Sequence, residues 1–406
     1  MIASRTAHVL RLAGLALIGS VVVCAVGAGS SSSAYPTSGP LIEFWDGTSW
    51  TQQLGPNPNG TGRFSAVSAL SATDAWAIGA YSTGDVENAL ATHWDGSSWQ
   101  LVAMPTPADK FDFSDMAAIS ATDVWAVGWH GRRQFKSEHP LIEHWNGSAW
   151  TIVPHPSPGE NSLLNGVAAV SPRNVWAVGA YSAAPHRYND RTLILHWNGT
   201  SWKRIPSPHP GTSAFPGSQL SGVAVVSAKS IWAVGSYSRR AQSSNSGWWT
   251  LTLVLHWNGK KWRQVRSTNP DADRGSNALY DVAAVGRNNV WAVGGSYTYQ
   301  TPPLVEHWNG HPWHAVPAAS GCPHSYWQPL TDLAPLARND IWAAGTGVGP
   351  YPCDSGGLAT SEALAEHWDG NAWSVSPIVN PPLSVDDAFL GIAAAAPHAV
   401  WAVGYY

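Results

Sequence analysis

Short apolar segments separated by tight polar turns recur along the chain. Residues 113–153 hold four such segments, each long enough for a strand and too short for a helix, at 116–119, 124–128, 141–145 and 150–153. A three-residue turn at 121–123 separates the first two segments. The Asn-Gly pair at 146–147, a hairpin signal typical of a two-residue type I′ turn, separates the last two. The pattern predicts four antiparallel strands, called strand one to strand four below.

Two tryptophan motifs repeat this pattern seven times. The motif Trp-(Asp/Asn)-Gly-x-x-Trp joins strands three and four, and its first Trp is Trp45, Trp94, Trp145, Trp197, Trp257, Trp308 and Trp368. The motif Trp-Ala-(Val/Ile/Ala)-Gly forms strand two, and it begins at Trp76, Trp125, Trp176, Trp232, Trp291, Trp342 and Trp401. A regular period of this length indicates a repeat fold in which each unit stacks on its neighbours.

The two ends of the chain hold complementary halves of one repeat. Residues 41–53 supply strands three and four, and the chain stops after strand two at Tyr406. An open sheet edge is a liability, so the two halves are expected to pair and close a ring. We predict an all-β fold, a seven-bladed β-propeller of four-stranded antiparallel blades, over residues 35–406 as a single domain. The last blade combines about 388–406 with 40–54. A linear solenoid is the alternative, and it would require capping repeats.

The Gly of strand two, followed by a Trp-bearing hairpin, resembles the kelch repeat and the central propeller of galactose oxidase. The double glycine of the kelch repeat occurs once, at Gly294-Gly295, and the Trp-x4-Trp hairpin spacing is narrower than in kelch repeats. The chain also looks like secreted bacterial repeat proteins rich in Asp-Val-Trp-Ala-Val-Gly. The resemblance implies the fold and carries no chemistry.

The repeats explain most of the tryptophan content of the chain. The chain has 406 residues and 25 Trp, of which the two motifs explain 21. Charged residues make up only 12%, about half of the roughly 25% usual for soluble domains. The net charge of −4 argues against a nucleic-acid partner, which would require a strongly basic surface.

The N-terminal segment resembles a secretory signal peptide. Arg5 and Arg11 precede an apolar run over residues 12–26, and small residues follow. We expect residues 1–34 to be the signal peptide, with cleavage after Ala28 or Ala34; an uncleaved membrane anchor is the alternative. We therefore expect a secreted, extracellular or cell-surface protein with no membrane span in the mature chain.

Two cysteines, Cys322 and Cys353, remain after cleavage. In an oxidising compartment we expect them to form a disulfide, although two free buried thiols stay possible. The bridge would close a loop of about 30 residues and stabilise the fold by roughly 3–4 kcal/mol.

The predicted propeller has two unlike faces. Its tight-turn face carries the short strand one–two and strand three–four turns. Its long-loop face carries the strand two–three and blade-to-blade connections, which vary between repeats, and function concentrates in such loops. Four tryptophans outside the motifs belong to this face, together with arginines and a tyrosine: Trp129, Trp248, Trp249, Trp327, Arg132, Arg133, Arg239, Arg240 and Tyr326. Aromatic rings beside arginines suit stacking on sugars or anchoring a protein. Local packing of these rings against their own loops is the alternative.

Two further groups of residues invite a functional interpretation. Asp115, Asp281 and Asp332 begin innermost strands at the long-loop mouth of the axial channel. They could gather around a cation such as calcium, but hydrogen bonding to loop N–H groups is the preferred interpretation. Histidines precede the strand-three Trp in six repeats, at His93, His144, His196, His256, His307 and His367. They lie too far from the axis to converge on one metal, so we expect interblade packing or hydrogen bonding.

These observations favour a secreted, non-catalytic propeller that recognises a glycan or an extracellular protein on its long-loop face. The alternative is a secreted carbohydrate-active enzyme, either a galactose-oxidase-like oxidase, a hydrolase or a lyase. We expect a monomer with no cofactor, no metal and no catalytic residue that the sequence can name.

Overall fold

The computed structural model describes residues 39–406 with gaps in the connecting segments. The gaps are 59–60, 85, 108–109, 133–136, 160, 183–190, 212–216, 241–247, 271–275, 297–302, 320–328, 349–360 and 379–386. The predicted signal peptide at 1–34 therefore lies outside the described residues.

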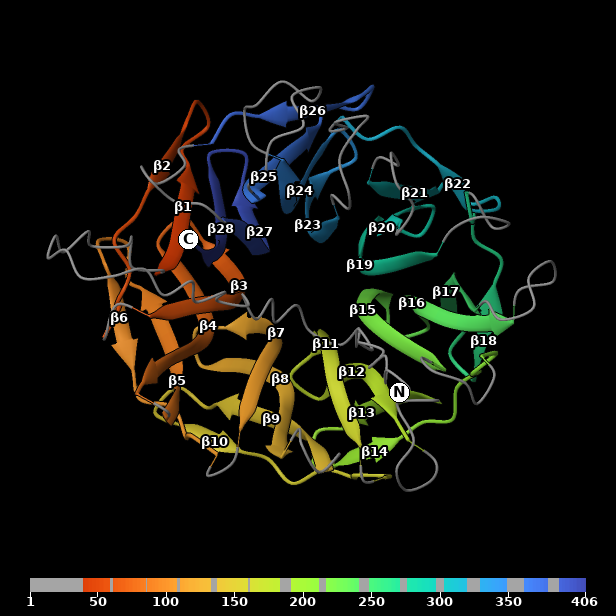
Figure 1. Cartoon of the computed structure of the whole chain (residues 1–406), viewed down its shortest axis with the longest axis horizontal. Helices are drawn as coiled ribbons and strands as arrows, with labels where there is room; N and C mark the ends of the chain where they lie inside the picture. Colours follow the sequence, from red (N-terminus) through yellow and green to blue (C-terminus); the bar gives the residue numbers. More distant parts are fainter. Residues whose placement is uncertain are drawn as a thin grey trace, which may run out of the picture.

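The described residues form 28 strands in seven four-stranded antiparallel sheets, arranged as blades around a central axis (Figure 1). Blade 1 comprises β3 (Gly62–Ser71), β4 (Asp74–Thr83), β5 (Val86–Trp94) and β6 (Trp99–Val102). Blade 2 comprises β7 (Phe111–Ser120), β8 (Asp123–Arg132), β9 (Ser137–Trp145) and β10 (Trp150–Ile152). Blade 3 comprises β11 (Ser162–Ser171), β12 (Asn174–Tyr181), β13 (Arg191–Trp197) and β14 (Trp202–Arg204).

The next three blades continue around the ring. Blade 4 comprises β15 (Ser218–Ser227), β16 (Ser230–Arg240), β17 (Trp248–Trp257) and β18 (Trp262–Val265). Blade 5 comprises β19 (Asn277–Gly286), β20 (Asn289–Ser296), β21 (Leu304–Trp308) and β22 (His314–Ala315). Blade 6 comprises β23 (Leu330–Ala337), β24 (Asp340–Val348), β25 (Ser361–Trp368) and β26 (Trp373–Ser376). Within the described part of the chain there is no helix that could cross a membrane.

Blade 7 is built from both ends of the chain, as predicted. It comprises β27 (Ala388–Ala396), β28 (Ala399–Tyr405), β1 (Pro40–Trp45) and β2 (Trp50–Gln52), in the spatial order β2-β1-β28-β27. Leu41 faces Gly404 across the junction. Beyond the strands, Gly39 and Tyr406 exchange two backbone hydrogen bonds of 2.9 and 3.0 Å. The β1–β28 ladder therefore closes the ring (Figure 1).

The glycine that ends the strand-two motif is required by a β-bulge in strand one. In blade 2 the bulge lies between Phe113 and Asp115, and it brings the carbonyl oxygen of Asp112 against Gly128. A Cβ atom on Gly128 would overlap this oxygen. The same clash with strand-one backbone occurs in all seven blades, at Gly79, Gly128, Gly179, Gly235, Gly294, Gly345 and Gly404.

The motif tryptophans pack between neighbouring blades. Trp125 of blade 2 is 1% exposed and meets two tryptophans of blade 3, Trp197 at 5.2 Å and Trp202 at 5.3 Å between ring centroids. Equivalent groups belong to each of seven buried apolar clusters. Large aromatic rings therefore contribute buried apolar surface at every junction between blades, which explains the tryptophan content.

The strand three–four hairpin differs in register from the sequence prediction. Trp145 pairs with Trp150, so four residues form the turn rather than two. The Asn146 side chain accepts the N–H groups of Ser148 and Ala149, each at 3.0 Å, and Gly147 has a φ of 90°. This side-chain hydrogen bonding stabilises the wider turn. Directly opposed residues share one face of a sheet, so both tryptophans still face the same neighbouring blade.

The two tight turns of each blade lie together, as expected. In blade 2, Trp145 Nε1 donates to the carbonyl oxygen of Ala121 at 3.1 Å, which joins the hairpin to the strand one–two turn. The opposite ends of β8 and β9 meet through His130 and His139. The tight-turn face and the long-loop face are therefore distinct surfaces of the ring.

Candidate functional site

Four of the predicted ligand-binding residues meet at the long-loop end of blade 4. Cross-strand pairing places Arg239 opposite Trp249 and Arg240 opposite Trp248 at the open end of the β16–β17 hairpin. Both arginines are exposed, Trp248 is 47% exposed, and Trp249 is half-buried. The chain therefore presents two aromatic rings and two cations within one small area.

Trp129 does not belong to this exposed group. It lies within β8, paired with Asp112 and Pro140, and only 6% of its side chain is exposed. The expectation that its ring is exposed on the long-loop face is wrong. Strand two of blade 2 is longer than its motif, and the extra length carries Trp129 into the packed sheet. Local packing, the alternative, applies here.

Several predicted site residues cannot be placed. Arg132 ends β8 and its side chain is outside the described part. The remaining predicted positions outside the described residues are Arg133, Tyr326, Trp327, Cys322 and Cys353.

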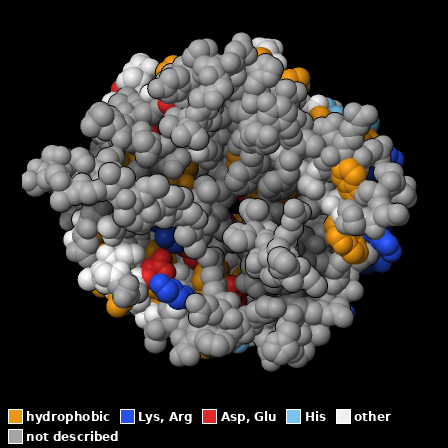
Figure 2. Space-filling model, viewed as in Figure 1, with side chains coloured by type: hydrophobic (Ala, Val, Ile, Leu, Met, Phe, Trp, Pro, Cys, Tyr) orange, Lys and Arg blue, Asp and Glu red, His pale blue; other side chains and the backbone are white. Residues whose placement is uncertain are grey.

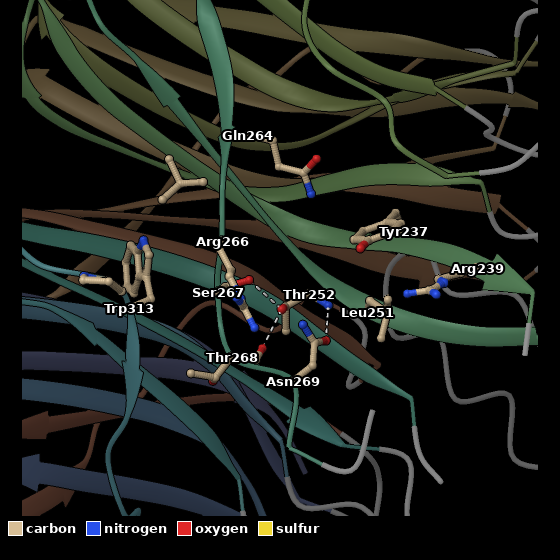
Figure 3. Close-up of a pocket in the computed structure, with 12 residues that line it drawn as sticks. Tyr237, Arg239, Leu251, Thr252, Gln264, Arg266, Ser267, Thr268, Asn269 and Trp313 are labelled. Atoms are coloured by element: carbon tan, nitrogen blue, oxygen red, sulfur yellow. Dashed lines mark hydrogen bonds between the residues drawn. The ribbon is translucent and has the colours of Figure 1, made fainter. Parts of the chain in front are cut away.

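A pocket of about 560 Å³ lies at the outer side of blade 4, against the hairpin of blade 5 (Figure 3). This volume falls within the roughly 300–1,000 Å³ of ligand sites. Its walls come from strands two, three and four of blade 4, from the segment that follows β18, and from blade 5. The lining residues are Tyr237, Arg239, Leu251, Thr252, Gln264, Val265, Arg266, Ser267, Thr268, Asn269, Pro312 and Trp313. We call this the blade 4 pocket.

A hydrogen-bond network fixes one wall of the blade 4 pocket. Thr252 donates its N–H to Asn269 Oδ1 at 2.8 Å and its hydroxyl to the carbonyl oxygen of Thr268 at 2.8 Å. Its hydroxyl also lies 2.7 Å from Ser267 Oγ (Figure 3). These bonds hold the segment after β18 against β17, so the wall is pre-formed.

Polar groups of the blade 4 pocket lack the partners that their counterparts have in blade 3. In blade 3, Arg204 Nη1 donates to the Tyr181 hydroxyl at 3.3 Å, and its guanidinium lies 5.4 Å from the ring centroid. Blade 4 has Gln264 at the position of Arg204 and Tyr237 at that of Tyr181. Among the described residues, neither the Tyr237 hydroxyl nor the side-chain amide of Gln264 has a hydrogen-bond partner. The replacement of Arg by Gln leaves both groups available to a ligand.

Sequence reasoning missed most of this pocket. Arg239 was singled out from its neighbouring tryptophans, but Gln264, Arg266 and Asn269 follow a strand-four Trp in a segment without a motif. One signal was present. Tyr237 belongs to the extended motif Trp-Ala-Val-Gly-x-Tyr, whose counterpart in blade 3 ends at Tyr181.

The three axial aspartates hold neighbouring blades together. Asp115 accepts the N–H of Val167 in blade 3, and Asp332 accepts that of Ile392 in blade 7, each at 2.7 Å. Asp281 accepts the N–H of Leu333 in blade 6 at 3.1 Å. Each aspartate lies at the strand-one bulge rather than at the strand start, so its partner is a neighbouring strand and not a loop.

Burial raises the pKa values of all three carboxyls, and charge repulsion raises those of Asp115 and Asp281 further. Burial, and then the charge of Asp332, raises the pKa of Asp115 to about 8. Burial and the charges of Asp332 and Asp115 raise the pKa of Asp281 well above its ordinary range, and Asp281 and Asp332 also hydrogen-bond to each other. Among the described residues, no three acidic, histidine or cysteine side chains are close enough to hold a metal ion. The geometry favours hydrogen bonding over a cation site.

The six histidines form hydrogen bonds, but within blades rather than between them. His144 Nε2 lies 2.8 Å from Asp123 Oδ1, and its ring stacks on Trp125 at 4.2 Å. The other five occupy the same place, with partners at Asp74, Asn174, Ser230, Asn289 and Asp340. Their structural role explains their repetition.

An ion cluster lies on the long-loop face across blades 1 and 2. Arg63 Nη2 lies 3.0 Å from Asp112 Oδ1, and Nη1 lies 3.4 Å from Glu87 Oε1. Figure 2 shows acidic and basic side chains side by side over these blades. Because Arg63 is already paired with two carboxylates, this cluster is a weaker candidate for a ligand than the blade 4 pocket.

Comparisons with known proteins identify the fold. No protein family and no curated protein matches the sequence. The structure is similar to YCF48 bound to a D1 peptide, with 14% identity over 85% of this chain and 91% of the other, at a TM-score of 0.50. It is also similar to an ulvan lyase of polysaccharide lyase family PL25, with 12% identity over 82% and 88%, at 0.50. An α-L-arabinofuranosidase from Fusarium graminearum, Arb93A, gives 13% identity over 81% and 98%, at 0.49. At such identities the likeness concerns the fold, and the chain is a seven-bladed β-propeller.

Proposed function

We propose that this protein is a secreted, non-catalytic propeller that binds a glycan in the blade 4 pocket. The observation that carries the proposal is the pocket itself, a pre-formed hollow with unpartnered polar groups beside Trp248 and Trp249. Sugars are bound by stacking on aromatic rings and by planar polar side chains. The blade 4 pocket and its rim combine both.

The chemistry of the lining supports binding rather than cleavage. Glycoside hydrolysis ordinarily uses two carboxyl groups that flank the scissile bond. The twelve described residues that line the blade 4 pocket include no Asp, Glu, His or Cys. A carbohydrate-active enzyme, which is the alternative, would require catalytic groups from elsewhere.

Secretion, a monomeric state and a kelch-like origin of the repeats belong to the same proposal. The N-terminal sequence supports export, and the kelch resemblance rests on the strand-two glycine and the Trp-bearing hairpin. A secreted protein would meet glycans and other extracellular proteins.

A glycan array tests the proposal. Wild-type protein should bind a set of glycans that a Trp248→Ala/Trp249→Ala double variant and a Gln264→Ala variant bind about tenfold more weakly or not at all. Ile152→Ala, which removes an equally exposed apolar side chain from blade 2, is the matched control and should bind normally.

Three outcomes would overturn parts of the proposal. Equal binding by wild type and the blade 4 variants would remove the site. Capture of an extracellular protein, with no glycan bound, would replace the ligand class. New reducing or unsaturated ends in the bound glycan would show an enzyme.

A further inference from the structure

We infer that the ligand of the blade 4 pocket is an anionic saccharide, whose carboxylate or sulfate is held by Arg239 and Arg266. This inference rests on the proposed glycan-binding function and goes beyond it by assigning the charge of the ligand. It also gives Arg266 a role in specificity that its sequence context does not indicate.

The charge of the blade 4 pocket is entirely positive among its described lining residues. Arg239 and Arg266 are the charged members of the lining, and the remaining side chains are polar or apolar. The whole chain has a net charge of −4, so this local excess of positive charge runs against the average. Figure 2 shows basic side chains at the rim beside β18.

The two arginines approach the pocket from different elements. Arg239 lies near the end of β16, and Arg266 directly follows β18. Figure 3 shows them on either side of Leu251 and Thr252. A group bound over Thr252 would therefore lie between two guanidinium groups.

Neither arginine is neutralised by a described carboxylate. The ion pairs within the described part of the chain involve other side chains. Glu306 is the carboxyl bonded to the pocket wall, where Thr268 donates its hydroxyl at 2.8 Å and its N–H at 3.3 Å. Burial raises the pKa of Glu306 to about 7, so this group is partly protonated at neutral pH. The Glu306 carboxyl therefore neutralises little of the positive charge of the two arginines.

The chemistry of guanidinium favours oxyanions. Its planar array of N–H donors matches the two oxygens of a carboxylate or the oxygens of a sulfate, and such charge-assisted hydrogen bonds are stronger than neutral ones. Tyr237 and Gln264 supply neutral groups suited to sugar hydroxyls. An acidic sugar would use both sets, whereas a neutral sugar would leave the two cations without a counterpart.

Binding measurements on three related probes test the inference. The probes are an oligogalacturonate, the same oligosaccharide with its carboxylates reduced to alcohols, and an O-sulfated derivative of the reduced form. At about 50 mM salt, at least one charged probe should bind about tenfold more tightly than the neutral one, and the difference should shrink at about 500 mM salt. The two charged probes distinguish carboxylate from sulfate.

Variants of the two arginines test whether these residues cause the preference for a charged probe. Arg239→Gln and Arg266→Gln should each weaken binding of the charged probe about tenfold and weaken binding of the neutral probe by a clearly smaller factor. Arg204→Gln, the same change on the outer strand of blade 3, is the matched control and should have no effect. Circular dichroism of each variant checks that the fold is intact.

The outcomes separate this inference from the proposed function. If the neutral probe binds as tightly as the charged ones, and loses affinity in Gln264→Ala, the glycan site stands and the charge assignment fails. If charged probes bind equally to wild type and both arginine variants, the assignment also fails. If no glycan binds, on the array or in solution, both proposals fail.

Discussion

The carboxylate of Asp115 in blade 2 accepts the backbone N–H of Val167 in blade 3, at 2.7 Å, and the N–H of Met116 at the same distance. One side chain therefore joins the innermost strands of two blades at the axial channel. The same arrangement recurs between blades 6 and 7 through Asp332, where the partner is the N–H of Ile392.

Asp115→Ala should destabilise the protein. The variant leaves two strand-one N–H groups without their acceptor, so the free energy of unfolding should fall by about 1–3 kcal/mol. Urea denaturation measures the change, and Asp115→Asn, which retains one acceptor oxygen, should recover part of it. A calcium-dependent melting temperature, present in the wild type and lost in Asp115→Ala, would instead indicate a cation site.

Glu143→Leu should stabilise the protein. Glu143 is fully buried between blades 1 and 2, and neither of its carboxyl oxygens has a hydrogen-bond partner among the residues that the structure describes. The equivalent Glu306 and Glu366 each accept the N–H of the sixth residue after a strand-four Trp, Thr268 and Ala319. In blade 1 that residue is Pro105, which has no N–H to donate.

Leucine already occupies the position of Glu143 in blades 3 and 4, at Leu195 and Leu255, and is buried there. Glu143→Leu should therefore raise the free energy of unfolding by about 1–3 kcal/mol. Glu306→Leu is the contrasting variant, because it removes a bonded carboxyl and should be destabilising. A loss of stability in Glu143→Leu would mean that this carboxyl has a partner in solution.

Stability should fall as pH rises from about 5 to 9. Burial raises the pKa of Glu143 and the pKa of Asp115 to about 8, from ordinary values of 4.5 and 3.8. A carboxyl whose pKa is higher in the folded state stabilises the fold fully below its ordinary value, and this contribution is lost as pH rises through the folded value. The melting temperature should thus be lower at pH 9, and Glu143→Leu should reduce the difference. A melting temperature that rises over this interval would contradict the assignment.

Gly128→Ala should disrupt blade 2. The added methyl group would overlap the carbonyl oxygen of Asp112 and lie 2.9 Å from the Cα atom of Phe113. We expect a loss of about 3 kcal/mol or more, or failure to fold. Gly286→Ala is the control, because no atom of the described residues other than its own chain neighbours lies within 4 Å of its added Cβ. Similar melting temperatures for the two variants would show that the bulge can relax.

The Cys322–Cys353 disulfide remains a prediction from sequence. Both residues lie outside the described part of the structure. Peptide mapping of the protein without reduction should recover the two cysteines as one linked peptide, and reduction should lower the melting temperature. Quantitative labelling of two free thiols in the native protein would refute the bridge.

The fold could be predicted because each blade repeats the same physical requirements. Trp125 fills the gap between blades, and Gly128 avoids the bulge of strand one. The residues at 116–119 predicted only part of β7, since the remaining positions alternate with polar side chains and carry no motif. The hairpin register was wrong because the side chain of Asn146 supports a longer turn than the Asn-Gly rule assumes.

The candidate site could be predicted from the sequence less completely than the fold. The pairing of Arg239 with Trp249 depends on how far strands two and three extend beyond their motifs, which no local pattern reports. For the same reason, the expectation that Trp129 is exposed at the surface was wrong. Gln264 and Arg266 enter the site through the packing of an irregular segment against the neighbouring blade, and such contacts are set by tertiary structure.

The pairing of β1 with β28 has a consequence for biosynthesis. Strand β1 precedes the other described strands in the chain and its partner β28 follows them, so the nascent chain holds an unmatched hydrogen-bonding edge until β28 has been synthesised. A truncated product would remain an open arc with two such edges, prone to associate with other chains. Ring formation therefore depends on the last of the described strands to be synthesised.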